Sequence, residues 1–258
     1  MKVGILAGGL GSRLAEETVI KPKPMVEIGG KPILWHIMRH YLHYGHDEFV
    51  VAAGYRGEVI KRWMVDYAHL AGDVTVRPRA GEVTRLDNGD CEDWTVSVVD
   101  TGQSSNTGGR IKRLQPWMND GTFMVTWGDG VSDIDLDELI RFHRSHGRVA
   151  TLTAVRPPAR YGHLITDEHE RITEFSEKPQ IGEGWINGAF FVFEPAVFDY
   201  IDGDETQFEK EPLERLAKDG ELMAYRHHGF WQCMDTVREK HILEELWRTG
   251  QAPWQTWE

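Results

Sequence analysis

The feature that most constrains the fold is a short apolar run that ends at a cluster of glycines. Val3 to Leu6 is followed by Ala7-Gly8-Gly9-Leu10-Gly11-Ser12-Arg13. An apolar run stopped by glycines is typical of a buried strand that feeds a loop. Glycines let backbone N–H groups approach phosphate oxygens closely. The segment therefore predicts a strand followed by a loop that can hold a phosphate group.

The spacing of these glycines differs from two familiar nucleotide motifs. Leu14 stands where a dinucleotide fingerprint needs its third glycine, and no Gly-Lys-Ser/Thr follows as in a P-loop. The loop taken alone is also compatible with a plain turn that joins a strand to a helix.

The rest of the chain alternates strand-like and helix-like runs. We expect strands at Glu48–Ala53, Thr95–Val99, Thr122–Trp127, Ala150–Val155 and Gly188–Phe193. We expect helices at Ile33–Tyr44, Glu58–Tyr67, Asp135–His146, Pro212–Lys218 and Val237–Trp247. This order predicts an α/β fold of Rossmann-like type, a mostly parallel mixed sheet flanked by helices. The simplest division is one domain over 1–258, with residues 72–93 as a polar hairpin or flap.

Charge and composition exclude some classes of protein. The net charge is −12, from 41 acidic and 29 basic residues, which argues against a nucleic-acid binder. No apolar segment is long enough for a signal peptide or a membrane span, so no membrane partner and a cytoplasmic location are the expectation. Cys91 and Cys233 have no metal-ligand spacing and are expected to be reduced thiols.

Two cations follow the glycine loop. Arg13 closes it, and Lys23 lies in Lys21-Pro22-Lys23-Pro24-Met25. The prolines stiffen the backbone on both sides of Lys23. A rigidly held cation beside a phosphate loop suits charge stabilisation at a reacting phosphorus. Lys21 is expected to be solvated.

The run Leu6 to Leu14 followed by Lys21 to Met25 resembles the signature of the sugar-1-phosphate nucleotidylyltransferases. Further stretches resemble the cytidylyltransferase branch of that family: Val26–Met38, Asp100–Arg110, Gly128–Gly130, Ile186–Gly188, Gly229–Thr236 and Ala252–Glu258. The likeness runs from end to end. It implies transfer of CMP from CTP to glucose 1-phosphate with Mg²⁺ as cofactor, and a homo-oligomer, a hexamer in the family. The polar segment Gly72–Asp93 and the Trp-rich C-terminal tail are candidates for subunit contacts.

The resemblance also implies site residues. It assigns catalysis to Arg13 and Lys23. It assigns nucleotide binding to Leu6, Ala7, Gly8, Gly9, Leu10, Gly11, Ser12, Arg13, Lys23, Ser105, Thr107, Gly108, Gly109, Arg110, Gly128 and Asp129. It assigns sugar-phosphate binding to Tyr161, Gly162, Glu177, Lys178, Asn187 and Gly188.

Asp129 and Asp235 are the metal-binding residues that the resemblance implies. Asp129 follows an expected buried strand, and ligands of α/β sheets gather at the carboxyl ends of strands. Mg²⁺ often takes only one or two protein carboxylates. The alternatives are a turn aspartate at Asp129 and a helix N-cap at Asp235.

Other functions stay open. The same chemistry with UTP, dTTP or another sugar 1-phosphate is the nearest alternative, and a nucleotide-sensing subunit without turnover is one of a different class. An oxidoreductase is disfavoured by the missing third glycine. His36 and His40 have ligand-like spacing but lack the glutamate of a zinc-protease helix, so surface or packing roles are expected. The expected role of Trp231, Trp247, Trp254 and Trp257 is as core or interface anchors.

Overall fold

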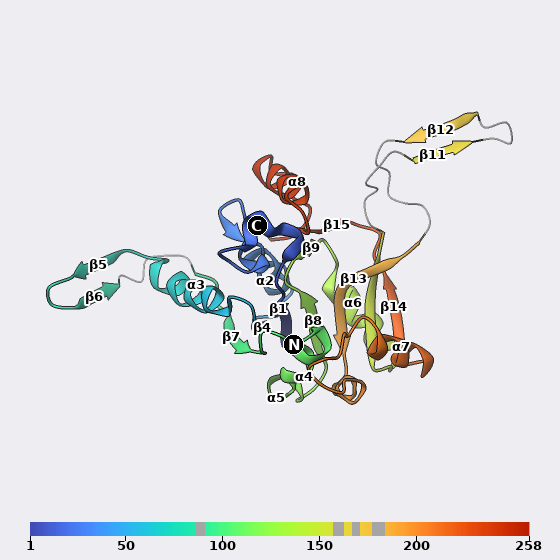
Figure 1. The fold of residues 1–258 in the computed structure, drawn as a ribbon, viewed down its shortest axis with the longest axis horizontal. Coiled ribbons are helices and arrows are strands. Elements are labelled where there is room, and N and C mark those ends of the chain that lie inside the picture. Colours follow the sequence, from blue (N-terminus) through green and yellow to red (C-terminus); the bar gives the residue numbers. More distant parts are fainter. Residues whose placement is uncertain (86–90, 157–162, 167–170, 177–183, 258) are drawn as a thin grey trace.

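A seven-stranded sheet forms the centre of the computed structural model, which describes residues 1–85, 91–156, 163–166, 171–176 and 184–257 (Figure 1). The strand order is β14-β10-β13-β8-β1-β4-β7. These strands span β1 Val3–Ala7, β4 Glu48–Ala53, β7 Thr95–Asp100, β8 Phe123–Trp127, β10 Ala150–Val155, β13 Ile186–Phe193 and β14 Leu222–Arg226. β1 pairs in parallel with β4 and β8, and β10 with β14, whereas β13 is antiparallel to both of its neighbours. The predicted mostly parallel mixed sheet is confirmed.

Side chains alternate between the two faces of each strand, so one apolar layer forms on each face of the sheet. In β1, Val3 and Ile5 face one layer and Leu6 faces the other. The first layer is covered by α2 Ile33–His43, α3 Gly57–Leu70, α6 Leu136–His146 and α8 Val237–Arg248. The second is covered by α4 Thr107–Arg113, α5 Gln115–Met118, the 3-10 helix η3 Pro195–Tyr200 and α7 Glu211–Lys218. Both faces of the sheet are therefore buried, as a parallel sheet requires.

The predicted helices and strands of the body all exist, with ends shifted by a few residues. The largest difference is α3, which begins at Gly57 and runs three residues beyond the expected end to Leu70. Asp135 caps α6, because its Oδ1 accepts a hydrogen bond from Glu138 N at 2.8 Å. Asp235, for which an N-cap was the alternative role, is not the N-cap of α8. The N-cap is the next residue, Thr236.

Short elements complete the chain around the sheet. They are η1 Ser12–Leu14, α1 Ala15–Thr18, η2 Lys23–Met25, β2 Glu27–Ile28, β3 Lys31–Pro32, β9 Gly130–Ser132 and β15 Trp231–Cys233. β15 pairs with β9, which brings the segment before α8 beside the segment after β8.

Two hairpins project from the body (Figure 1). One joins β5 Val74–Arg77 to β6 Glu82–Arg85, which is the hairpin alternative of the two predicted for residues 72–93. The other joins β11 His163–Thr166 to β12 Ile172–Ser176, between β10 and β13. Among the described residues, none of the helices has the length and apolarity needed to cross a membrane.

The C-terminal tail packs on α2. Trp254 is fully buried, and Trp257 is 9% exposed within the same cluster as Trp35. His36 is also fully buried, and its Nε2–H donates to Ile28 O at 2.8 Å. These residues therefore form part of the core, which is one of the two roles predicted for the tryptophans and for His36.

Candidate active site

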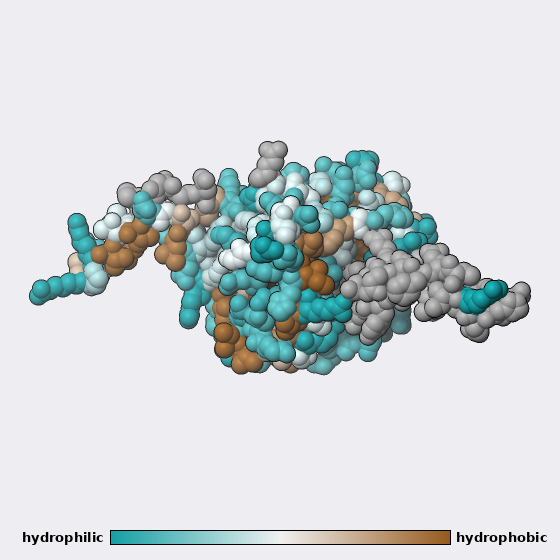
Figure 2. Space-filling model, turned by 90° about the horizontal axis from the view of Figure 1, so that it is seen from above, coloured by the Kyte–Doolittle hydropathy of each residue, from teal (hydrophilic) through white to brown (hydrophobic). Residues whose placement is uncertain are grey.

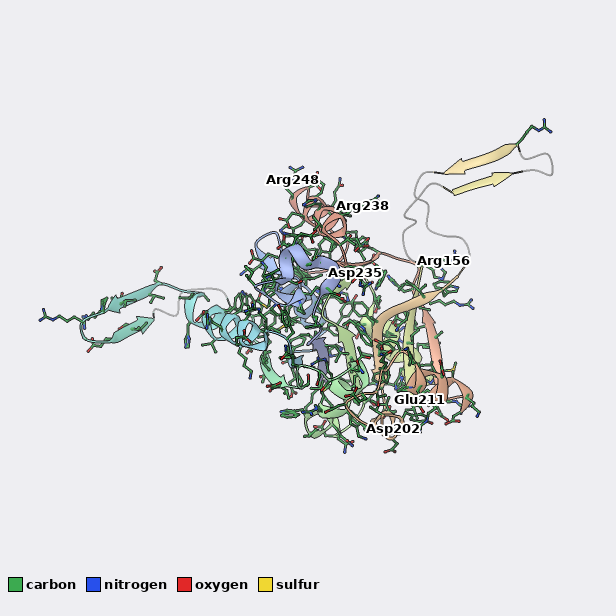
Figure 3. All side chains as sticks on the ribbon, in the orientation of Figure 1. Arg156, Asp202, Glu211, Asp235, Arg238 and Arg248 are labelled. Atoms are coloured by element: carbon green, nitrogen blue, oxygen red, sulfur yellow. The ribbon has the colours of Figure 1, made fainter. Side chains whose placement is uncertain are left out.

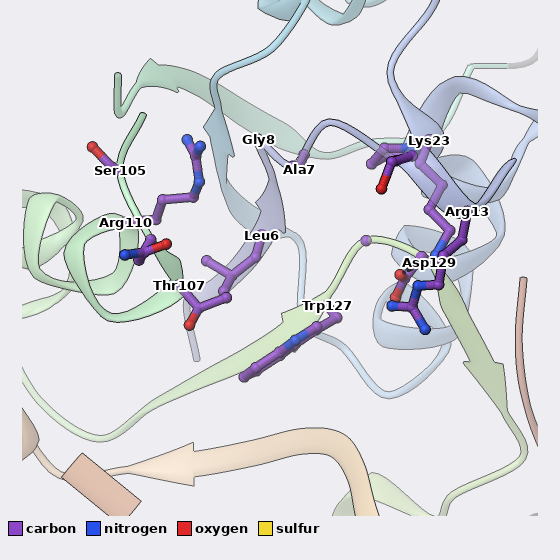
Figure 4. A pocket seen from close by; sticks show the side chains of 16 residues that line it. Leu6, Ala7, Gly8, Arg13, Lys23, Ser105, Thr107, Arg110, Trp127 and Asp129 are labelled. Carbon is purple, nitrogen blue, oxygen red and sulfur yellow. Dashed lines mark hydrogen bonds and ion pairs between the residues drawn. The ribbon is translucent and has the colours of Figure 1, made fainter. Parts of the chain in front are cut away.

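A cavity of about 300 Å³ opens at the carboxyl ends of β1 and β8. It is lined by Leu6, Ala7, Gly8, Gly9, Gly11, Ser12, Arg13, Lys23, Pro24, Ser105, Asn106, Thr107, Arg110, Trp127, Gly128 and Asp129. Figure 4 shows Arg13, Lys23 and Asp129 together at one end and Ser105, Thr107 and Arg110 at the other. The position of the cavity is the one expected for a ligand of an α/β sheet.

The glycine loop forms one wall of the cavity, and close contacts restrict which residues fit at some of its positions. A Cβ on Gly8 would lie 2.1 Å from Arg110 Nη1, so only glycine fits there without moving that side chain. Gly11 has a φ of 64°, a left-handed conformation that glycine adopts at little cost. A Cβ on Gly9 would meet no atom within 4 Å, so this residue borders open space.

Lys23 lies between two carboxylates. Its Nζ donates to Asp129 Oδ2 at 2.6 Å and also to Asp235 Oδ1. Only 9% of the Lys23 side chain is exposed. Burial opposes its charge, but the negative charge of Asp129 and the hydrogen bonds to both aspartates outweigh burial and raise the pKa of Lys23. The side chain is therefore a permanent, well-oriented ammonium group.

Asp235 approaches this end from a distant part of the sequence. It follows β15, and its neighbour Met234 donates a backbone hydrogen bond to Asp129 O at 2.8 Å. Its Oδ2 also accepts a hydrogen bond from Arg13 Nη1. Two cations and two carboxylates thus compensate each other beside the glycine loop.

Arg110 organises the opposite end of the cavity from a buried position. Its Nη1 donates to Thr101 Oγ1 and Gly102 O, each at 2.8 Å, and its Nη2 donates to Gln103 O at 3.3 Å. Burial lowers the pKa of Arg110. The side chain therefore holds the backbone that leads from β7 into Ser105.

The remaining expected nucleotide residues lie outside the cavity. Gly108 and Gly109 pack α4 against the loop after η3: a Cβ would lie 2.7 Å from Thr206 O or 2.5 Å from Asp204 Cα. Leu10 is 61% exposed to solvent. Pro24, Asn106 and Trp127 line the cavity although they were not predicted, and their positions beside Lys23, Ser105 and Gly128 are the signal that could have found them.

The expected sugar-phosphate residues are described only in part. Tyr161, Gly162, Glu177 and Lys178 lie outside the described residues. Asn187 and Gly188 lie at the start of β13, at the edge of the sheet that carries the cavity. The next residue, Ala189, has a φ of 61°, which is sparsely populated for a residue with a Cβ. Such strain concentrates at functional sites.

Arg156 and Trp185 flank the excursion between β10 and β13. The Arg156 guanidinium carbon lies 4.8 Å from the centre of the Trp185 ring, and that of Arg226 lies 5.6 Å from it. Figure 3 shows Arg156 and Asp235 at the same edge of the sheet. Cation–π contacts therefore join the two ends of this excursion.

The chain belongs to the nucleotidyl transferase family, whose model matches residues 2–244. The α/β fold agrees with that family, and so does the glycine loop with cations and carboxylates beside it. Within it, the chain is 51% identical over 259 residues to the glucose-1-phosphate cytidylyltransferases of Salmonella typhi and Salmonella typhimurium, and the alignments cover 100% of each chain.

A solved structure has the same fold. The crystal structure of HddC from Yersinia pseudotuberculosis superposes with a TM-score of 0.70 at 23% identity, covering 95% of this chain and 99% of that one. At this identity, the likeness supports the architecture alone.

Proposed function

We propose that the chain transfers CMP from CTP to α-D-glucose 1-phosphate and releases CDP-glucose and pyrophosphate. The observation that carries the proposal is the convergence of Lys23, Asp129 and Asp235 beside the glycine loop of a nucleotidyl transferase fold. The choice of CTP and glucose 1-phosphate is supported by the full-length relatives of that name.

The nucleotide lies along the cavity in this proposal. Its phosphates face the backbone of Gly8 and Gly9 and the side chains of Arg13 and Lys23. Its base reaches toward Ser105 and Thr107, at the end of the cavity that Arg110 organises. Because Gly108 and Gly109 pack against the 204–206 loop, their part is to bring α4 close to the site rather than to contact the base.

Asp129 and Asp235 fit a Mg²⁺ ion. Their carboxylates already converge on one cation, the Lys23 ammonium, which occupies the kind of position that a metal ion takes between two acidic oxygens. Two carboxylates completed by phosphate and water are a usual magnesium donor set. When bound, the metal supplies positive charge that stabilises the transferring phosphoryl group.

The reaction needs positioning and charge rather than a general base. The phosphate of the sugar is already an anion near neutral pH, so its oxygen can attack the α-phosphorus of CTP directly. A new oxygen–phosphorus bond forms, the bond to the β-phosphate oxygen breaks, and its electrons leave with pyrophosphate. Arg13 and Lys23 neutralise the charge that builds on the phosphate oxygens. Lys23 is well suited because its raised pKa keeps it protonated.

The sugar phosphate enters beside β13 in this proposal. Trp231 Nε1 donates to Gly188 O at 2.8 Å, which ties the start of β13 to β15, the strand that leads to Asp235. Tyr161, Gly162, Glu177 and Lys178 belong to the excursion whose ends Arg156 and Trp185 hold together.

A second copy of the chain is the proposed partner. Val74, Val76 and Val83 share one face of the projecting β5–β6 ribbon and are 36%, 55% and 64% exposed. Figure 2 shows apolar surface along this arm, next to α3, where Val65 and Leu70 are also exposed. An isolated two-stranded hairpin is marginally stable in water, so an apolar face on one needs cover from outside the protomer.

Pyrophosphate release tests the reaction. The purified chain is offered each of the four ribonucleoside triphosphates and dTTP, each with several sugar 1-phosphates, with and without Mg²⁺. The proposal predicts release only with Mg²⁺ and fastest with CTP and glucose 1-phosphate. A preference for UTP or dTTP would instead favour the same reaction with that nucleotide. Nucleotide binding without release under any condition would instead favour a sensing subunit.

A further inference from the structure

The first turn of α8 holds the backbone of Asp235. Glu239 Oε2 accepts hydrogen bonds from Asp235 N at 2.7 Å and from Thr236 N at 2.9 Å, and Thr236 Oγ1 accepts one from Glu239 N at 3.3 Å. The bonds between Thr236 and Glu239 form a capping box. The additional bond reaches the residue before the cap, which a box does not require in order to end a helix.

Asp235 is therefore held from both sides. On its N-terminal side, Met234 N donates to Asp129 O at 2.8 Å, which fixes the spacing of the two aspartate segments. On its C-terminal side, the carboxylate of Glu239 fixes the peptide N–H of Asp235. The Asp235 carboxylate, directed at Lys23 and Arg13, starts from a backbone with little freedom to turn.

We propose that Glu239 is a positioning residue that aims the Asp235 carboxylate at the metal shared with Asp129. This inference rests on the proposed function, since it takes Asp235 as a metal ligand. Groups that orient a metal-binding carboxylate commonly change metal affinity about 10- to 100-fold when they are removed. Glu239 contributes through Asp235 and does not need to touch substrate.

A cap elsewhere in the chain separates this role from helix capping alone. Asp135 caps α6 through a side-chain bond to Glu138 N at 2.8 Å and has no part in the site. D135A removes one side-chain hydrogen bond from the N-terminus of α6, and E239A removes two from the N-terminus of α8. E239Q keeps an oxygen that can accept from Asp235 N and Thr236 N.

Binding of Mn²⁺ to the full chain, followed by electron paramagnetic resonance at a fixed concentration of CTP and without sugar phosphate, is the direct measurement, because phosphate completes the proposed donor set. We expect E239A to weaken Mn²⁺ binding about tenfold or more. We expect D135A and E239Q to bind Mn²⁺ as the unaltered chain does. In turnover assays, E239A should raise the Mg²⁺ concentration needed for half-maximal rate and leave the KM for glucose 1-phosphate unchanged.

Three results would overturn the inference. Equal Mn²⁺ affinity of E239A and D135A would reduce Glu239 to a helix cap. Weak binding by E239Q as well as by E239A would replace positioning with a requirement for the negative charge. Failure of the unaltered chain to bind Mn²⁺ would remove the metal role of Asp235, whereas a changed choice of NTP or sugar would affect the proposed function alone.

Discussion

At the scale of single residues, the buried ammonium of Lys23 carries most of the proposed chemistry. We expect K23A to lower kcat by about 100-fold or more, because it removes a positioned cation from the transferring phosphate. K21A is the matched control, since Lys21 does not line the cavity and approaches Glu27 at 3.7 Å. Steady-state kinetics of both variants at saturating Mg²⁺, with circular dichroism to show that they are folded, make the comparison. Near-normal turnover of K23A would remove Lys23 from the mechanism.

The sequence predicted the residues of this cluster better than their contacts. Arg13, Lys23 and Asp129 follow recognisable local patterns, a loop after a strand or a lysine between prolines. Asp235 could be joined to them only through family resemblance. Its contact with Lys23 depends on the pairing of β15 with β9, a three-residue ladder between segments about a hundred residues apart that no local pattern encodes.

At the scale of elements, the packing of α4 links the base end of the cavity to the fold. We expect G109A to destabilise the chain by about 1–3 kcal/mol and to raise the KM for CTP, because its Cβ would lie 2.5 Å from the backbone of Asp204. G203A adds a Cβ with no atom within 4 Å and should behave as the unaltered chain. Urea unfolding and CTP-dependent kinetics check both effects. Equal stability of the two variants would contradict this packing role.

The helix α2 makes stability depend on pH. Burial lowers the pKa of His36 and of His40 from 6.5 to about 4. Below pH 6.5 the unfolded chain takes up protons that the folded chain does not, so stability is complete above pH 6.5 and falls as the pH drops toward 4. Each histidine contributes up to about 1.4 kcal/mol per pH unit in this window.

The variant H36Q tests that pH dependence. It should lose less stability than the unaltered chain between pH 7 and pH 5, as measured by the urea midpoint at each pH. An identical loss in both proteins would show that the burial of His36 does not set the dependence.

Helices with a long apolar repeat were predicted correctly, whereas features that depend on tertiary contacts were not. Asp135 was recognised as the cap of α6, and the helices of the body have clear apolar spacing. The three-residue strands β9 and β15 are too short for a period. The direction of β13, antiparallel inside a parallel sheet, depends on the excursion between β10 and β13 and not on its own residues.

At the scale of the whole molecule, the β5–β6 arm is the part least explained by one protomer. The double variant V76D/V83D should dissociate the proposed oligomer and leave the body folded, because charge on the apolar face opposes burial. T75D/T84D places the same charges on the opposite face of the same ribbon. Size-exclusion chromatography with light scattering compares them. A monomeric unaltered chain, or equal dissociation by both pairs, would contradict the role of this face.

The β5–β6 arm was only partly predicted, because residues 72–93 were interpreted as a polar hairpin or flap. The segment has valines at alternate positions among charged residues, so its apolar face is visible only once the register of the hairpin is known. The faces of the central sheet were easier to predict, since both are buried and the central strands β1 and β4 are mostly apolar.

The fate of an isotope label in the phosphate of glucose 1-phosphate tests the proposed reaction most directly. Glucose 1-phosphate carrying ¹⁸O on the phosphate oxygens is incubated with CTP, Mg²⁺ and the chain, and the products are analysed by mass spectrometry. Attack by the sugar-phosphate oxygen on the α-phosphorus predicts that all the label appears in CDP-glucose and none in pyrophosphate. Label in pyrophosphate, or formation of CMP without labelled CDP-glucose, would contradict the proposed reaction.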